Sequence, residues 1–314
     1  MDKLILKARQ DMNLFAQGFS AIGEANFIRV LEAFRSERVS AQHFATTTGY
    51  GYNDLGRDKL EALYARVFHG EAALVRQNIV SGSHAIALAL AGNLLPGDEL
   101  LCLGMPYDTL QTVMGLKRPV PGSLRESGIS CRVYDLDFTT PDLNGILAAL
   151  RPETKMVAVQ RSRGYSSRPS LSIAKLAAIA QALKAARPEL IVFVDNCYGE
   201  FVEPSEPTDW HVDLMAGSLI KNPGAGLAPG GGYIVGKEAY VERAAYRLTI
   251  PGAGRELGAA LTDQRPFYQA LFLAPQVVQE ALLCAVFTAS ICQSLGFAVS
   301  PEPDEARTDI IQTI

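Results

Sequence analysis

Between residues 71 and 236 the sequence alternates short apolar runs with segments of helical period. Short runs that are apolar throughout are typical of strands buried on both faces, and a helix between two such strands makes them run parallel. The apolar runs are 73–75, 100–103, 131–134, 156–159, 191–194, 214–218 and 232–235. The helical segments between them include 83–94, 143–150 and 173–186. We therefore expect an α/β fold with a mostly parallel, helix-covered sheet and one or two antiparallel additions near Gly232.

Helical patterns also precede this alternation. Apolar residues recur at intervals of three and four between residues 11 and 39, which is the period of an amphipathic helix. A loop rich in Gly, Thr and Tyr follows at 46–54, and a second amphipathic segment covers 57–68. The N-terminal part is thus expected to be a helical arm.

The C-terminal part differs in composition from the middle of the chain. An Ala-rich helix is expected over 277–294, and residues 302–311 resemble the approach to a further strand. We expect the chain to end inside a second domain. The predicted parts are an N-terminal helical arm (1–48), a large domain (49–273) and the start of a truncated small C-terminal domain (274–314).

Charge and cysteine content narrow the class of protein. The net charge of −4 leaves no basic stripe for nucleic acid or an anionic membrane, so a small molecule is the expected partner. The apolar run at residues 4–6 is too short for a signal peptide or a membrane span, which indicates a cytoplasmic protein. The five cysteines contain no CxxC and the four histidines are scattered, so we expect neither a disulfide framework nor a metal site.

Small residues open the helix that follows the first apolar run. Ser81, Gly82 and Ser83 lie at this expected helix start, where backbone N–H groups have no partner within the helix. Two hydroxyl groups beside such N–H groups suit a phosphate. An ordinary serine N-cap is an equally good interpretation of these residues alone.

Polar residues follow two other runs. Tyr107 comes just after the run 100–103, at the strand end where ligands of open α/β sheets lie, and its ring is suited to stacking on a flat cofactor. A surface tyrosine is the plainer interpretation.

Asp195 ends the run 191–194, and a carboxylate so placed needs a partner such as a protonated pyridine nitrogen. Magnesium is the competing partner, but the sequence has no GxxxxGK[ST] motif.

Lys221 follows the apolar run 214–218 and precedes a Gly-rich stretch at 224–232. Desolvation at the end of a buried strand lowers the pKa of an ammonium group, as Schiff-base chemistry requires. Ser218, three residues earlier, is placed to reach a phosphate. A lysine, an acid, a phosphate cradle and a ring clamp are what pyridoxal 5'-phosphate needs from a protein, so we expect it as the cofactor.

The order of these segments and their amino-acid sequences resemble those of a known family. Residues 50–57, 81–85, 194–200 and 218–226, together with Tyr107, are similar to the methionine gamma-lyase / aluminium resistance protein family. This family belongs to the Cys/Met-metabolism enzymes of PLP fold type I, whose large domain is aspartate-aminotransferase-like. The resemblance extends over about residues 49–258, and the Asp195 and Lys221 segments are its most specific parts.

The resemblance implies a role for each matching residue. Lys221 would form the internal aldimine, Asp195 would contact the pyridinium nitrogen, and Tyr107 would cover the ring. The phosphate would be bound by Ser81, Gly82, Ser83 and Ser218. Tyr52 and Arg57 lie where related enzymes reach into the neighbouring subunit's site, which implies a homodimer or tetramer with shared active sites.

The implied activity is a PLP-dependent carbon–sulfur lyase acting on sulfur-containing amino acids, by methionine gamma-lyase or cystathionine-type elimination. An aminotransferase would use the same lysine and aspartate, and a weakly catalytic PLP-binding stress-response protein is a third interpretation. The arginine that binds the substrate carboxylate in this fold normally comes from the small domain, beyond Ile314. Arg161, Arg163 and Arg168 follow another apolar run and either face the pocket or form a solvated loop.

Overall fold

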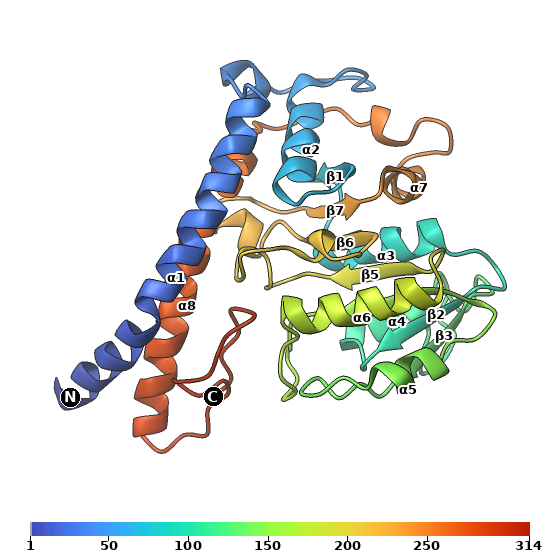
Figure 1. The fold of residues 1–314 in the computed structure, drawn as a ribbon. Helices are drawn as coiled ribbons and strands as arrows, with labels where there is room; N and C mark the ends of the chain where they lie inside the picture. The colour runs from blue at the N-terminus through green and yellow to red at the C-terminus, as the bar shows by residue number, and fades with distance from the viewer. Residues whose placement is uncertain (1) are drawn as a thin grey trace.

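The computed structural model describes residues 2–314, so residue 1 of the predicted arm lies outside the described part (Figure 1). Its centre is a seven-stranded sheet with the order β1-β7-β6-β5-β4-β2-β3. The strands are β1 (Ala72–Arg76), β2 (Glu99–Leu103), β3 (Ser130–Tyr134), β4 (Thr154–Gln160), β5 (Ile191–Asp195), β6 (Leu214–Ser218) and β7 (Gly232–Gly236). Every predicted run forms a strand. Only β7 pairs antiparallel, with β1 and β6, which confirms the predicted mostly parallel sheet.

Helices cover both faces of the sheet. Side chains along a strand alternate between faces, so Leu100 packs in one core cluster and Leu101 in the other. One face carries α3 (Gly82–Asn93), α4 (Asp108–Met114) and α7 (Glu238–Leu248). The opposite face carries α2 (Leu55–Val67), α5 (Leu143–Ala148) and α6 (Ile173–Ala186). Four short 3₁₀ helices complete the connections: η1 (Ala41–Phe44), η2 (Pro207–Asp209), η3 (Asn222–Gly224) and η4 (Gly254–Glu256).

Two long helices, α1 (Asp2–Ser36) and α8 (Arg265–Ser294), lie side by side along one flank of the sheet domain (Figure 1). The predicted helical arm is confirmed, although its helix begins near residue 2 instead of residue 11. Helix α8 also begins earlier than predicted and runs through Pro275. Proline removes one backbone hydrogen bond, but Leu271 and Val278 on either side of it are buried in the core and hold the helix together.

Helix α8 is long and apolar enough, by length and composition, to cross a membrane. Of its most apolar 18-residue window, 44% is buried inside the protein. Phe267, Leu282 and Val286 of this helix belong to the same core cluster as Val30 of α1. The apolar character of α8 is thus explained by its packing against α1 and the sheet domain.

Residues 295–314 return from the end of α8 toward the sheet (Figure 1). Ser300 and Thr313 form an isolated β-bridge, in the region predicted to approach another strand. The Asp309 carboxylate accepts a hydrogen bond from the backbone N–H of Arg163 at 3.0 Å, and the Ile310 N–H donates to the carbonyl of Tyr198 at 3.3 Å. This segment therefore packs against the loops that follow β4 and β5.

Candidate functional site

The parallel strands all end at the same edge of the sheet, and a cavity of about 210 Å³ opens there. Asp195 is the last residue of β5 and pairs with Ala216 of β6, so the two neighbouring strands deliver Asp195 and Lys221 to the same place. Ligands of open α/β sheets bind at this edge. Seven of the residues predicted from the sequence line the cavity: Ser81, Gly82, Ser83, Tyr107, Asp195, Ser218 and Lys221.

The start of α3 forms one wall of the cavity. Ser81 is the N-cap of this helix, and its Oγ accepts a hydrogen bond from the His84 N–H at 3.1 Å. A Cβ atom on Gly82 would lie 2.8 Å from the Cβ of Ser218, so this close approach of α3 to the end of β6 requires glycine. The N-cap interpretation is confirmed, and Ser81, Gly82 and Ser83 of this turn line the cavity together with Ser218 at the end of β6.

Tyr107 lies at the N-cap position of α4, and its hydroxyl is 2.6 Å from the Oγ of Ser83. Burial raises the pKa of this phenol above its usual value. The side chain is only partly buried and lines the cavity, which leaves its ring available to a flat ligand. It is not the plain surface tyrosine that was the alternative interpretation.

Asp195 is 4% exposed, and its Oδ1 accepts a hydrogen bond from the Cys197 N–H at 3.1 Å. Burial raises the pKa of this carboxyl group to about 6, although Cys197, Lys221 and Arg168 act in the opposite direction. A buried carboxyl with a raised pKa gains most from a cation placed directly against it. The Asp195 carboxyl group is therefore suited to accept a hydrogen bond from a protonated pyridine nitrogen.

Lys221 follows β6 at the N-cap position of η3. Desolvation lowers the pKa of its ammonium group, and the charges of Cys197 and Asp195 partly offset this effect. Its Nζ hydrogen bonds the hydroxyl of Tyr198 and lies 3.6 Å from the centroid of that ring. An amine held in a partly desolvated pocket is suited to attack on an aldehyde.

Tyr198 was missed in the sequence analysis, as were Gln160 and Cys197, which also line the cavity. Tyr198 has a φ of 69°, in the left-handed region that a bulky side chain rarely adopts. The available signal was position, since Gln160 ends β4 and the other two residues closely follow Asp195 at the end of β5.

Tyr52 and Arg57 lie outside this cavity and line a different pocket. Arg57 is 3% exposed, and its Nη1 donates to the carbonyls of Gly51 at 2.7 Å and Gly258 at 2.9 Å. Tyr52 is 57% exposed. Arg57 therefore holds two loops of the chain together, whereas the side chain of Tyr52 lies mostly at the surface.

None of the three candidate arginines lines the cavity, so the expectation that they face it is wrong. Arg161 is completely buried and donates to the Oδ1 of Asn196 at 2.9 Å and to the carbonyl of Gly199 at 2.8 Å. Arg163 is also buried, with its Nη1 bonded to the Oγ of Ser300 at 2.8 Å. The solvated-loop alternative is wrong for these two residues as well.

Arg168 is partly buried at the same loop. Its Nη2 donates to the carbonyl of Gln160 at 2.9 Å, and its guanidinium carbon lies 3.7 Å from the centroid of the Phe138 ring. The guanidinium group of Arg168 is thus bonded to backbone carbonyl groups and packs on the Phe138 ring. All three arginines stabilise the loop between β4 and α6, because each has partners within the protein.

The chain is similar to several known proteins. Residues 1–314 match the methionine gamma-lyase family. The Bacillus subtilis protein YnbB is 48% identical over 317 residues, which cover 100% of this chain and 75% of that protein. The structure of a carbon–sulfur lyase involved in aluminium resistance from Clostridium novyi is 45% identical, with a TM-score of 0.95 over 99% of this chain and 75% of that one.

A more distant structure supports the fold alone. The pyridoxal-5'-phosphate-dependent protein YhfS of Escherichia coli is 16% identical, with a TM-score of 0.66 over 92% of this chain and 74% of that one. The predicted PLP fold type I is therefore confirmed. The match over the whole chain and the high identity to YnbB place this chain in the methionine gamma-lyase family of carbon–sulfur lyases.

Proposed function

We propose that this chain binds pyridoxal 5'-phosphate through Lys221 and cleaves a carbon–sulfur bond in a sulfur-containing amino acid. The observation that carries the proposal is the meeting of Asp195 and Lys221, from neighbouring strands, in one cavity walled by the start of α3. Neither a buried acid nor a lysine at a strand end is by itself specific to a cofactor site. Together with an anion-binding helix start, they match the three polar ends of this cofactor.

Each part of the cavity suits one part of the cofactor. The N–H groups and hydroxyls at Ser81–Ser83 and the Ser218 hydroxyl would hold the phosphate. Asp195 would face the ring nitrogen, and a cation there would lower the pKa of the carboxyl from its raised value. Tyr107 would cover one face of the ring. When bound, the cofactor supplies an electron sink for charge that develops at the substrate Cα.

The protein's own groups would handle protons. The lowered pKa of Lys221 increases the fraction of neutral amine near neutral pH, which a general base at the Cα proton needs. Tyr198 holds the Nζ of Lys221 in the cavity, and the Tyr107 hydroxyl, which also lines the cavity, is bonded to Ser83. Elimination of the sulfur group would release a thiol, and one water molecule would then hydrolyse the remaining enamine or imine to ammonia and an oxo acid.

The proposal extends to assembly and location. Tyr50, Tyr52 and Leu261 are 79%, 57% and 73% exposed, and apolar side chains of this size favour burial against a second copy of the chain. We propose a homo-oligomer in which Tyr52 contributes to a neighbouring site. A small amino-acid substrate and a family of metabolic lyases support the cytoplasm as its location.

The test uses the purified chain loaded with pyridoxal 5'-phosphate and offered methionine, homocysteine and cystathionine. Release of thiol and ammonia, absent in Lys221→Ala, is the expected result. Transfer of the amine to an oxo acid without thiol would identify an aminotransferase instead. Cofactor binding without turnover of any sulfur amino acid would favour the weakly catalytic binding protein.

A further inference from the structure

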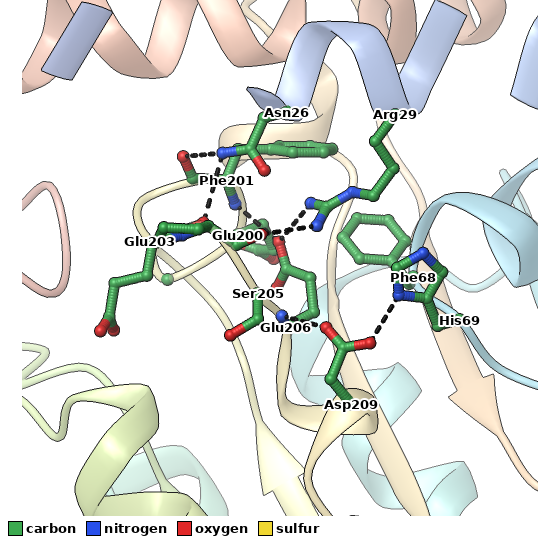
Figure 2. Close-up of polar contacts among 12 residues, drawn as sticks. Asn26, Arg29, Phe68, His69, Glu200, Phe201, Glu203, Ser205, Glu206 and Asp209 are labelled. Carbon is green, nitrogen blue, oxygen red and sulfur yellow. Dashed lines mark hydrogen bonds and ion pairs between the residues drawn. The ribbon is translucent and has the colours of Figure 1, made fainter. Parts of the chain in front are cut away.

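The loop that follows Asp195, the last residue of β5, carries Tyr198, and further along it residues 201–206 contact helix α1 (Figure 2). The Nδ2 of Asn26 donates to the carbonyl of Phe201 at 2.9 Å. Arg29, one turn further along α1, donates to the carbonyl of Pro204 at 3.1 Å. These contacts join residues about 175 positions apart in the sequence. The N-terminal helix therefore supports the loop of the proposed active site.

Glu206 lies at the centre of these contacts and is completely buried (Figure 2). Its Oε1 accepts hydrogen bonds from the Phe201 N–H at 2.9 Å and from the Nη2 of Arg29 at 3.3 Å. Its Oε2 accepts from the Nδ2 of Asn196 at 3.1 Å. All the partners are donors, which suits an ionised carboxylate. Burial raises the pKa of this group, and Arg29, Arg161 and the hydrogen bonds from Phe201 and Asn196 act in the opposite direction.

The two ends of the turn that contains Tyr198 are thus tied to one side chain. Asn196 precedes Tyr198 and Phe201 follows it, and both bond to Glu206. Tyr198 and Phe201 have φ values of 69° and 63°, in the left-handed region. Such conformations persist where surrounding contacts over-determine them. Glu206 supplies these contacts on the side away from the cavity.

We propose that Glu206 is a positioning residue of the site, which holds the turn after β5 so that Tyr198 stays on Lys221 and Asp195 stays at the cavity. Arg29 of α1 completes this support by pairing with the Glu206 carboxylate. Glu206 touches neither the cofactor nor the substrate in this proposal. The inference rests on the proposed cofactor site.

The test measures the rate constant at which the full chain, freed of cofactor, captures pyridoxal 5'-phosphate, followed by visible absorbance. Glu206→Gln keeps the shape and removes the charge, and it should slow capture about tenfold because Lys221 is no longer held in one orientation. Tyr198→Phe should slow capture to a similar extent. The variant that carries both changes should capture the cofactor at a rate within about twofold of the slower single variant. The effects should not multiply, because both changes act on the contact between Tyr198 and Lys221.

The matched control is Thr208→Val, an isosteric change in the same loop that removes the hydrogen bond from Thr208 to the Phe68 carbonyl. It should lower the thermal midpoint but leave the capture rate unchanged. If Glu206→Gln does not fold, Arg29→Met tests the same support, because it removes the partly exposed partner of the Glu206 ion pair. Arg29→Met should also slow capture, and its effect should not multiply with that of Tyr198→Phe when the two changes are combined.

The outcomes separate this inference from the proposed function. If the unaltered chain captures no cofactor, the proposed function fails. If it captures cofactor but neither Glu206→Gln nor Arg29→Met slows capture, the positioning role is overturned. The same holds if Thr208→Val slows capture equally, or if the effects of Glu206→Gln and Tyr198→Phe multiply in the double variant.

Discussion

The Nζ of Lys221 lies 3.6 Å from the centroid of the Tyr198 ring and hydrogen bonds the hydroxyl of the same side chain. The ring face and the hydroxyl oxygen both attract an ammonium group, so this one tyrosine limits where the amine can point. The left-handed backbone at Tyr198 brings its side chain to the lysine. This contact links the loop after β5 to the residue that follows β6.

Replacement of Tyr198 by Phe should slow covalent capture of pyridoxal 5'-phosphate about tenfold, because the hydroxyl no longer holds the amine of Lys221 in one orientation. The ring remains, so the fold should be little changed. Stopped-flow absorbance measures the rate. Tyr240→Phe, on α7, is the control and should behave like the unaltered chain.

Removal of the amine at Lys221 should abolish covalent attachment of the cofactor. Borohydride reduction of the loaded chain followed by peptide mapping should place the label on Lys221, and Lys221→Ala should carry none. Lys117→Ala changes an exposed lysine and should be labelled normally. A label on any other lysine would overturn the assignment.

Asp195→Asn should still bind the cofactor but slow removal of the substrate Cα proton by several orders of magnitude. A neutral amide no longer favours the protonated ring nitrogen, so the cofactor is a weaker electron sink. Exchange of the Cα hydrogen in heavy water, followed by NMR, measures this step directly. An unchanged exchange rate would show that Asp195 has no such role.

Cofactor affinity should depend on the ionisation of Asp195. Burial raises the pKa of its carboxyl group from 3.8 to about 6 in the cofactor-free chain. Below pH 6 the group is protonated and no longer attracts a pyridinium cation, so affinity should fall by about tenfold per pH unit. Titrations of the dissociation constant against pH test this, and the Asp195→Asn variant should lack this part of the pH dependence.

The same pKa shift has the opposite sign for the stability of the cofactor-free chain. The neutral carboxyl is favoured in the folded state, so its stabilising contribution is fully present below pH 3.8 and is lost as the pH rises through about 6. Comparison of urea unfolding of the unaltered chain and Asp195→Asn over this range measures the contribution. Parallel curves for the two proteins would contradict the assignment of the shift to Asp195.

Arg161→Met should destabilise the fold by about 3 kcal/mol. It breaks the ion pair between the buried Arg161 and the partly exposed Glu203, and it leaves the oxygen atoms of Asn196 and Gly199 without the donors that Arg161 supplies. Urea unfolding measures the loss. The KM for a sulfur amino acid should change little in the protein that remains folded. A large rise in KM without loss of stability would instead place Arg161 in substrate binding.

The sequence by itself determined the sheet and seven of the residues that line the cavity at its edge. Strands buried on both faces, such as β2, β5 and β6, are apolar along most of their length, so their runs were visible without knowledge of their neighbours. Polar residues directly after such runs share one edge of the sheet, and this rule identified Asp195, Lys221 and Tyr107. The resemblance to a family added the roles that this position alone leaves open.

Only the tertiary structure decided how the loops around the site are held. For Arg161 the sequence left a pocket residue and a solvated loop as the two interpretations, and it gave no sign that Glu206 is buried. Burial depends on distant parts of the chain, which the local sequence does not reveal. Glu206 is buried because Arg29 and Asn196, from distant parts of the chain, satisfy its carboxylate. Tyr198 reaches Lys221 through a left-handed backbone that few sequence patterns indicate and that these distant contacts maintain.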